Sequence, residues 1–222
     1  MRRTRAGEIL RTALRILGYQ IAFGFFGFMF VPAIMGAGAA IRILVVGLLV
    51  VAAGALMFMD GSYRGEKDCA MGETLERPAK KGTYRPSGAE QAKRYSRMKG
   101  VWSALLSALP VVLIAAYVAV TARPYEYTLQ DLPGWLGAYL PREEIGGALA
   151  YLQQPQPAAA LTDYLRVGVR FVLFPYVGLL GEMSDAQSLL FDRISPALAL
   201  IMPTVAAVGY QFGPARRRKS VR

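Results

Sequence analysis

The chain has 222 residues, a formal net charge of +11 and no histidine. Apolar residues make up 54% of it and charged residues only 18%, a balance that argues against a soluble basic domain and indicates an integral membrane protein. The lack of histidine excludes catalytic units and metal sites that need imidazole. The single cysteine, Cys69, excludes an internal disulfide and zinc sites built from several cysteines.

Four uncharged apolar runs are long enough to cross a bilayer as helices, which takes roughly 17–25 residues. They predict an all-α integral membrane protein, an antiparallel bundle of four transmembrane helices at residues 16–35, 43–59, 101–120 and 194–212. Ser195 followed by Pro196 is typical of a helix start, so we expect the fourth span to begin there.

Residues 36–41 are interpreted as a tight turn on the outer side, between the first two spans. Ala37-Gly38-Ala39 also resembles a signal-peptide cleavage site, but the apolar run before it is longer than such peptides usually carry.

A fifth apolar segment, residues 165–181, is ambiguous. Arg166 and Arg170 leave an uncharged run of only 11 residues, and Pro175 interrupts that run. A run of this length favours a re-entrant or interfacial helical segment. Five spans are the alternative, because short helices flanked by arginine do cross membranes when they pack against neighbours.

The distribution of Lys and Arg decides between four spans and five. The N-terminal segment 1–15 and the loop 60–100 each carry a net charge of +4, and the tail 213–222 carries +5, whereas the segment 121–193 carries −3. Cytoplasmic flanks collect Lys and Arg, so four spans with both termini in the cytoplasm fit all three basic segments. We expect one multi-pass domain in a prokaryotic-type inner (plasma) membrane, with 60–100 inside and 121–193 outside.

Residues 5–17 have the pattern of an amphipathic helix. Its polar face carries Arg5, Arg11 and Arg15, and its other face is apolar. A basic amphipathic helix before a span is typical of an anchor that lies in the inner headgroup layer. We therefore expect an interfacial anchor helix at residues 1–15 that leads into the first span and whose three arginines bind anionic lipid.

A charged cluster follows the second predicted span, at the start of the loop 60–100. It consists of Asp60, Arg64, Glu66, Lys67 and Asp68. We interpret the cluster as a site of interaction at the inner membrane face.

Two connecting segments are also expected to be helical. Ser87 and Glu90 have the spacing of a capping box and predict a helix that runs into the third span, with Gly100 as a swivel. The leucine and isoleucine spacing at residues 129–136 and 145–152 predicts two short amphipathic helices along the outer surface.

Small residues spaced four apart indicate faces on which membrane helices can approach closely. Such pairs in or beside the spans are Gly36/Ala40, Ser103/Ser107, Ala104/Ala108 and Ala115/Ala119, and Gly47 and Gly54 lie seven apart. Prolines inside three of the spans predict kinks, at Pro32, Pro110 and Pro203.

No residue pattern points to a catalytic, cofactor or metal site, and the basic charge is better explained by topology than by nucleic acid. We therefore expect a non-enzymatic membrane partner or accessory subunit that acts through helix packing and its basic cytoplasmic loop. Its expected contacts are anionic lipids and a protein partner or a second copy of the chain.

Two alternatives belong to other functional classes. One is a small oligomeric transporter or pore with an anion path near Arg166 and Arg170, which lie four residues apart and share a helical face. The other is a lipid-head-group enzyme that uses Asp60, Glu66 and Asp68, although a two-metal site needs more carboxylates than these three supply.

Overall fold

The computed structural model describes residues 5–34, 36, 38–80, 86–122, 139, 142, 145, 161–180 and 185–220. These residues form helices and short connections, with no strand among them. Four helices are long and apolar enough to cross a membrane, and each overlaps one predicted span. They are α1 (Arg5–Ile34), α2 (Ala39–Lys80), α4 (Arg97–Thr121) and α9 (Asp185–Ser220). The prediction of an all-helical chain with four such helices is confirmed.

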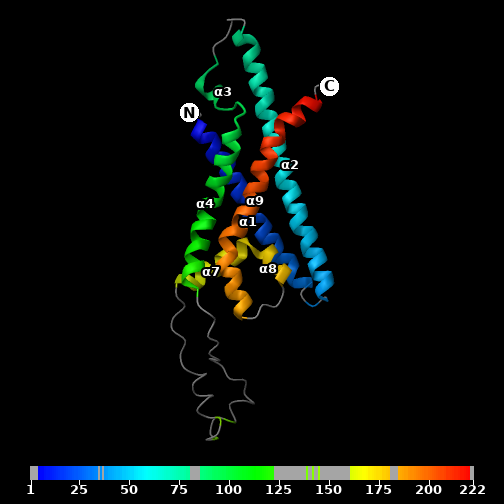
Figure 1. Ribbon diagram of the computed structural model, residues 1–222, viewed down its shortest axis with the longest axis vertical. Coiled ribbons are helices and arrows are strands. Elements are labelled where there is room, and N and C mark those ends of the chain that lie inside the picture. Colours follow the sequence, from blue (N-terminus) through cyan, green and yellow to red (C-terminus); the bar gives the residue numbers. More distant parts are fainter. Residues whose placement is uncertain are drawn as a thin grey trace.

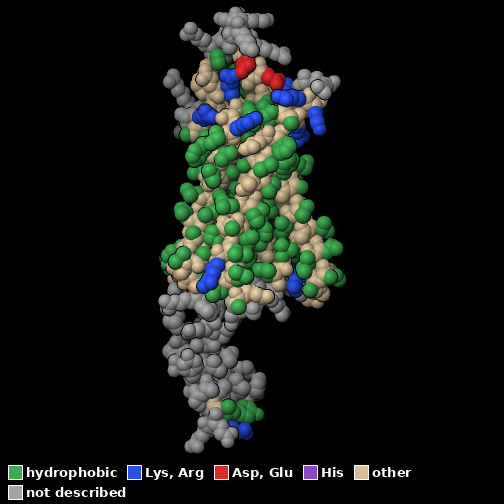
Figure 2. Space-filling model, in the orientation of Figure 1, with side chains coloured by type: hydrophobic (Ala, Val, Ile, Leu, Met, Phe, Trp, Pro, Cys, Tyr) green, Lys and Arg blue, Asp and Glu red, His purple; other side chains and the backbone are tan. Residues whose placement is uncertain are grey.

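The four long helices run side by side along the long axis of the molecule (Figure 1). The start of α1, the end of α9 and the short helix α3 (Gly88–Gln91) lie together at one end, which we call the basic end. Helices α7 (Leu161–Val172) and α8 (Phe174–Leu180) lie in the opposite half, toward what we call the far end. Figure 2 shows Lys and Arg side chains gathered at the basic end, above a wide belt of apolar side chains.

Helix α1 is continuous over 30 residues, so the predicted amphipathic segment and the first span belong to one helix. On the apolar face of that segment Ala13 is buried inside the bundle, whereas Leu10 and Leu14 are exposed. The position of the segment in a headgroup layer stays a prediction. No proline occurs before Pro32 to end the helix.

Helix α2 extends far beyond the predicted span 43–59. It has 42 residues and ends at Lys80, so residues 60–80 of the expected loop are helical. At 1.5 Å per residue the helix is about 63 Å long, which is about twice the thickness of a hydrocarbon core. Part of α2 must therefore project beyond any membrane that its apolar half crosses, and we call residues 60–80 the α2 arm.

The capping box predicted at Ser87 and Glu90 is present. The Ser87 N–H donates to the Glu90 carboxylate at 2.8 Å, and the Glu90 N–H donates to Ser87 Oγ at 3.4 Å. The predicted continuation into the third span is wrong, because α3 ends at Gln91 and α4 begins at Arg97. The Tyr95 N–H donates to the carbonyl of Asp68 at 3.3 Å, which holds the connecting segment against the α2 arm.

Helix α9 begins at Asp185, ten residues before the predicted start at Ser195-Pro196. Pro196 has no N–H, so the carbonyl of Asp192, four residues earlier, lacks its helical donor. The Ser195 hydroxyl donates to that carbonyl at 2.8 Å. Because the serine hydroxyl replaces the hydrogen bond that the proline cannot make, the helix continues through this Ser-Pro pair. The pair therefore does not mark a helix start here.

The ambiguous segment 165–181 falls on α7 and α8, which are separated at Leu173. With 12 and 7 residues, neither helix reaches across a hydrocarbon core of about 30 Å. Both pack on the bundle. Gly24 of α1 lies against the α7 backbone at Phe171 and Val172, and Gly178 of α8 lies against Val31 and Val46. The helices predicted at 129–136 and 145–152 lie outside the described residues, apart from Ile145.

Helices α2 and α9 approach each other closely through glycines. Gly61 and Gly65 of α2 face Gly209 and Gly213 of α9, and a Cβ built at any of the four would overlap the backbone of the other helix. We call this the glycine contact. Each pair is a Gly-xxx-Gly pattern that lets two backbones touch.

The small-residue patterns singled out in the sequence fall into two groups. Those of α4 lie inside the bundle, where Ser103, Ser107, Ala104, Ala108 and Ala115 are buried. At Gly36, Gly47 and Gly54 an added Cβ would meet nothing within 4 Å, so these glycines take no part in a tight contact. The close contact is instead made by the four glycines of the glycine contact.

Candidate functional site

The predicted charged cluster does not form a single site, because its members bind different parts of the chain. Asp60 accepts from two arginines: Arg15 of α1 at 2.7 Å and Arg64, one turn along α2, at 3.0 Å. Arg15 also donates to the Tyr19 hydroxyl at 2.8 Å. Asp60 therefore joins α1 to α2 at the end of the apolar run.

Three more carboxylates along the α2 arm pair with cations of other segments. Glu66 pairs with Arg216 at 3.0 Å and Glu73 with Arg217 at 3.2 Å, both on α9, and Glu76 pairs with Arg94 before α4. The partners in these pairs are partly exposed, so each pair contributes at most about 1 kcal/mol. The first two pairs align the arm with α9, and the third joins it to the segment before α4. Lys67, the remaining member of the predicted cluster, is exposed.

Asp68 is the centre of a more buried group. Lys99 of α4 donates to its carboxylate at 2.6 Å, and the Tyr210 hydroxyl of α9 donates to the same oxygen at 2.7 Å. The Lys99 side chain is only 6% exposed. The Tyr95 ring stacks on Tyr210 with the ring centres 5.3 Å apart, and Gly100 lies so close that a Cβ there would be 2.6 Å from the Tyr210 ring. Gly100 therefore serves close packing, not the swivel that was predicted.

Burial raises the pKa of the Tyr95 hydroxyl, and the electrostatic interaction with the neighbouring Cys69 raises it further. The ring that covers the Asp68 group is thus neutral at physiological pH. Asp68, Lys99 and Tyr210 connect three long helices at one point. Breaking such a buried pair leaves an uncompensated charge, which gives this group a structural role.

Arg5, Arg11 and Arg15, the predicted lipid contacts, have different environments. Arg5 donates to the Ser96 hydroxyl at 2.7 Å, and Arg15 is held by Asp60. Arg11 is exposed.

Arg166 and Arg170, the predicted anion contacts, converge on Asp192 of α9. Arg170 binds both carboxylate oxygens, each at 2.9 Å, and also donates to the Ser188 hydroxyl at 2.6 Å. Arg166 forms an ion pair with the same carboxylate. The side chains of Arg166 and Asp192 are 3% and 1% exposed. The sequence analysis did not single out Asp192, which the chain places 22 residues beyond Arg170.

This arrangement, which we call the Asp192 cluster, links α7 to α9. Buried charged side chains are tolerated when they are paired and hydrogen-bonded. Arg170 and Asp192 meet both conditions, and Arg166 is paired with Asp192. The two arginines therefore have a partner inside the protein, and the geometry favours a structural role for them over contact with a transported anion.

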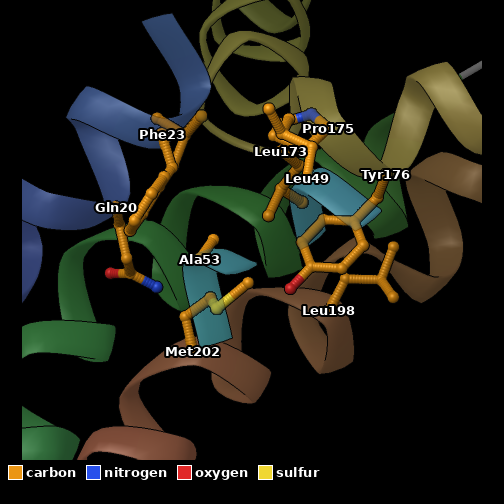
Figure 3. A pocket seen from close by; sticks show the side chains of 10 residues that line it. Gln20, Phe23, Leu49, Ala53, Leu173, Pro175, Tyr176, Leu198 and Met202 are labelled. Atoms are coloured by element: carbon orange, nitrogen blue, oxygen red, sulfur yellow. The ribbon is translucent and has the colours of Figure 1, made fainter. Parts of the chain in front are cut away.

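A small cavity lies between α1, α2, α8 and α9 (Figure 3). Its volume is about 20 Å³, enough for one water molecule. Gln20 and Tyr176 line it among apolar side chains such as Phe23, Leu198 and Met202. Gln20 Oε1 and Tyr176 Oη are buried and have no hydrogen-bond partner among the described residues.

Gln20 satisfies a carbonyl that a proline has left without a donor. Pro203 has no N–H, so the carbonyl of Ala199, four residues earlier in α9, loses its helical hydrogen bond. The Gln20 amide donates to that carbonyl at 3.0 Å, and both residues are buried. A polar residue near the start of the first apolar run thus compensates for a proline in the last one.

We expect Gln20→Leu to lower the free energy of unfolding by about 1–3 kcal/mol, because the Ala199 carbonyl would then be buried without a donor. In a Pro203→Ala background, the introduced alanine supplies the missing N–H, so the same Gln20→Leu change should cost less than half as much. Unfolding in mixed detergent micelles on titration with dodecyl sulfate measures both steps of this double-mutant cycle.

Gln211→Leu is the matched control for that cycle, since Gln211 is exposed on α9 and the change in hydropathy is the same. An equal cost of Gln20→Leu in both backgrounds would contradict the assignment of Gln20 to the carbonyl left by Pro203.

Asp60, Glu66 and Asp68, the carboxylates of the enzyme alternative, each bind cations of their own, as described above. Asp60 and Asp68 are eight residues apart on one helix, a rise of about 12 Å. Within the described ranges no three His, Cys, Asp or Glu side chains are grouped as metal ligands. The geometry therefore offers no specific support for that chemistry.

Comparison with known proteins yields no relative: no family model, no curated protein and no solved structure matches this chain.

Proposed function

We propose that the protein is a non-enzymatic membrane partner protein whose basic end binds an acidic surface of another protein in the cytoplasm. The observation that supports this most is the α2 arm, which continues the helix from the apolar run and is packed on α9 through the glycine contact. An arm fixed in this way holds its outward side chains in place. Binding to it therefore costs little conformational entropy.

The charge of the basic end suits an acidic partner. The carboxylates of the α2 arm are engaged by cations from α1, α4, α9 and the segment before α4, as described above. Exposed basic side chains surround them at the same end: Arg11, Lys67, Arg97, Arg218 and Lys219. An excess of exposed positive charge attracts an acidic surface and increases the rate of association.

The proposal includes an orientation. The basic end would lie in the cytoplasm, with both termini inside an inner or plasma membrane, as the excess of Lys and Arg indicates. The four long helices would then form an antiparallel bundle. Helices α7 and α8 would enter from the outer side as a re-entrant pair, supported by their packing on Gly24, Val31 and Val46.

Charge reversal at exposed positions of the basic end tests the proposal. We expect the triple change Lys67→Glu, Arg218→Glu and Lys219→Glu to reduce recovery of a cross-linked cytoplasmic partner at least tenfold, because each change replaces attraction by repulsion. The measurement is quantitative mass spectrometry of proteins that co-purify in mild detergent after cross-linking in cells. Arg193→Glu, an exposed reversal near the far end, is the control and should leave recovery unchanged.

The proposal is wrong if no cytoplasmic protein is enriched, or if its recovery survives the triple change. Cys69 provides a check on orientation, since it is the only cysteine and lies in the α2 arm. A membrane-impermeant maleimide should leave Cys69 unmodified in intact cells. The same reagent should modify Arg142→Cys, an exposed position in the outer segment, in a Cys69→Ser background.

A further inference from the structure

A second hollow, much larger than the cavity at Gln20, lies between α1 and α2 toward the basic end. Its volume is about 410 Å³, within the range of roughly 300–1,000 Å³ that is typical of small-molecule sites. Phe23 of α1 and Leu56 and Met57 of α2 form its apolar part, while Tyr19, Asp60 and Arg216 form its polar part. We call it the α1–α2 hollow.

The apolar and polar parts of the hollow follow one another along the long axis of the molecule. On α1, Tyr19 precedes Phe23 by one turn and so lies nearer the basic end. On α2, which runs in from the other direction, Asp60 follows Leu56 by one turn and also lies nearer the basic end. Both walls therefore change from apolar to polar at the same level. A site with this gradient matches an amphiphile that has an apolar chain and a polar head.

Exposed apolar side chains border the hollow. Leu56 on its rim is 59% exposed, and its neighbours Met59 and Tyr63 are also exposed. Figure 2 shows that the charged end and the apolar belt meet in this half of the molecule. A lipid lying in a surrounding bilayer could therefore place a chain in the hollow without leaving its own leaflet.

The polar part of the hollow is bordered by more positive than negative charge. Asp60 and Arg216 line it. Arg15 and Arg64 bind Asp60, and Arg216 binds Glu66, so the ion pairs at this border join three arginines to two carboxylates. Arg15 and Arg216 keep 49% and 48% of their side chains exposed, which leaves guanidinium N–H groups available to another acceptor. Arginine N–H groups match the oxygens of a phosphate.

We propose that the α1–α2 hollow binds one acyl chain of an anionic phospholipid, with the lipid phosphate held between Arg15 and Arg216. This inference is independent of the docking function proposed above, because none of the residues changed in that test lines the hollow. The bound acyl chain would lie between the two helices, on the side of the Asp60 ion pairs that faces away from the basic end.

Native mass spectrometry of the full chain, purified in detergent, tests this inference with dioleoyl phosphatidylglycerol and dioleoyl phosphatidylcholine as probes. We expect one phosphatidylglycerol per chain and about tenfold weaker binding of phosphatidylcholine. Arg15→Gln with Arg216→Gln should remove that preference. Leu56→Trp, which places an indole at the rim, should weaken binding of both lipids.

Matched variants distinguish lipid binding in the hollow from lipid contact elsewhere on the protein surface. Arg11→Gln with Arg218→Gln removes two exposed charges from the same two helices, and Leu48→Trp is the same substitution at an exposed position two turns away on α2. Both should bind like the wild type. Equal binding in all variants, or equal binding of the two lipids, would overturn the inference. Displacement of phosphatidylglycerol by inorganic phosphate alone would show an anion site without a chain and would overturn it as well.

Discussion

Replacing Asp192 by asparagine is expected to lower the free energy of unfolding by about 3–5 kcal/mol, because Arg166 and Arg170 would lose their shared counter-charge. Arg166 is almost fully buried, so water cannot replace the lost carboxylate. Asparagine keeps the size of the side chain, which separates the effect of charge from that of packing. Unfolding by dodecyl sulfate, or thermal unfolding in a mild detergent, measures the loss.

Arg193→Gln is the matched control for Asp192→Asn, since Arg193 is the next residue of α9 and is exposed. It should change stability by no more than about 0.5 kcal/mol. The double change Asp192→Leu with Arg166→Met replaces the buried pair by apolar side chains and should recover most of the lost stability. Arg170 is 20% exposed and can turn toward solvent in that variant.

If Asp192→Asn were as stable as the wild type, the Asp192 cluster would not be a structural element. The two arginines would then again be candidates for the anion path that their spacing first suggested. The stability of this one variant thus discriminates between the two interpretations of Arg166 and Arg170.

The apolar runs predicted four membrane-crossing helices, because run length and lack of charge are properties of each segment alone. The ends of those helices were harder to predict, because they depend on contacts with distant segments. The α2 arm is polar in sequence, and its helix is held by α9 and by ion pairs with α1 and α4. The Ser195-Pro196 pair has the composition of a helix start, but the Ser195 hydroxyl allows α9 to continue through it.

The partners of the candidate site residues were also hard to predict from the sequence. The spacing of Arg166 and Arg170 predicted a shared face, yet nothing near them in the sequence identifies Asp192 as their partner. The cluster from Asp60 to Asp68 looked like one site because its members are close in sequence. On a helix these residues point in different directions. Asp60 pairs with Arg15 of α1, Glu66 with Arg216 of α9, and Asp68 with Lys99 of α4.

The glycine contact could have been found from the sequence. Gly61-xxx-Gly65 and Gly209-xxx-Gly213 are both readable, but the first lies outside the apolar run in which membrane packing patterns were sought. Glycines inside the run, Gly47 and Gly54, instead have open space around them. Which glycines are packed depends on the face that α2 turns toward α9, and that is a property of the assembled bundle.

We expect Gly65→Ala and Gly213→Ala together to lower the free energy of unfolding by about 3 kcal/mol or more, because each added methyl overlaps backbone atoms that no side-chain rotation can move. The two helices would have to separate. That separation would also strain the hydrogen bond from Tyr210 to Asp68 and the pair of Glu66 with Arg216. Dodecyl sulfate unfolding of the purified variants measures the cost.

Gly54→Ala provides the contrast within the same helix. Its added methyl meets nothing within 4 Å, and alanine favours a helix over glycine by roughly 0.5–1 kcal/mol. The same glycine-to-alanine change on α2 should therefore lower the free energy of unfolding at Gly65, and leave it unchanged or raise it at Gly54. Equal effects at the two positions would mean that α2 and α9 do not touch through their backbones. The α2 arm would then lose the support on which the proposed docking surface depends.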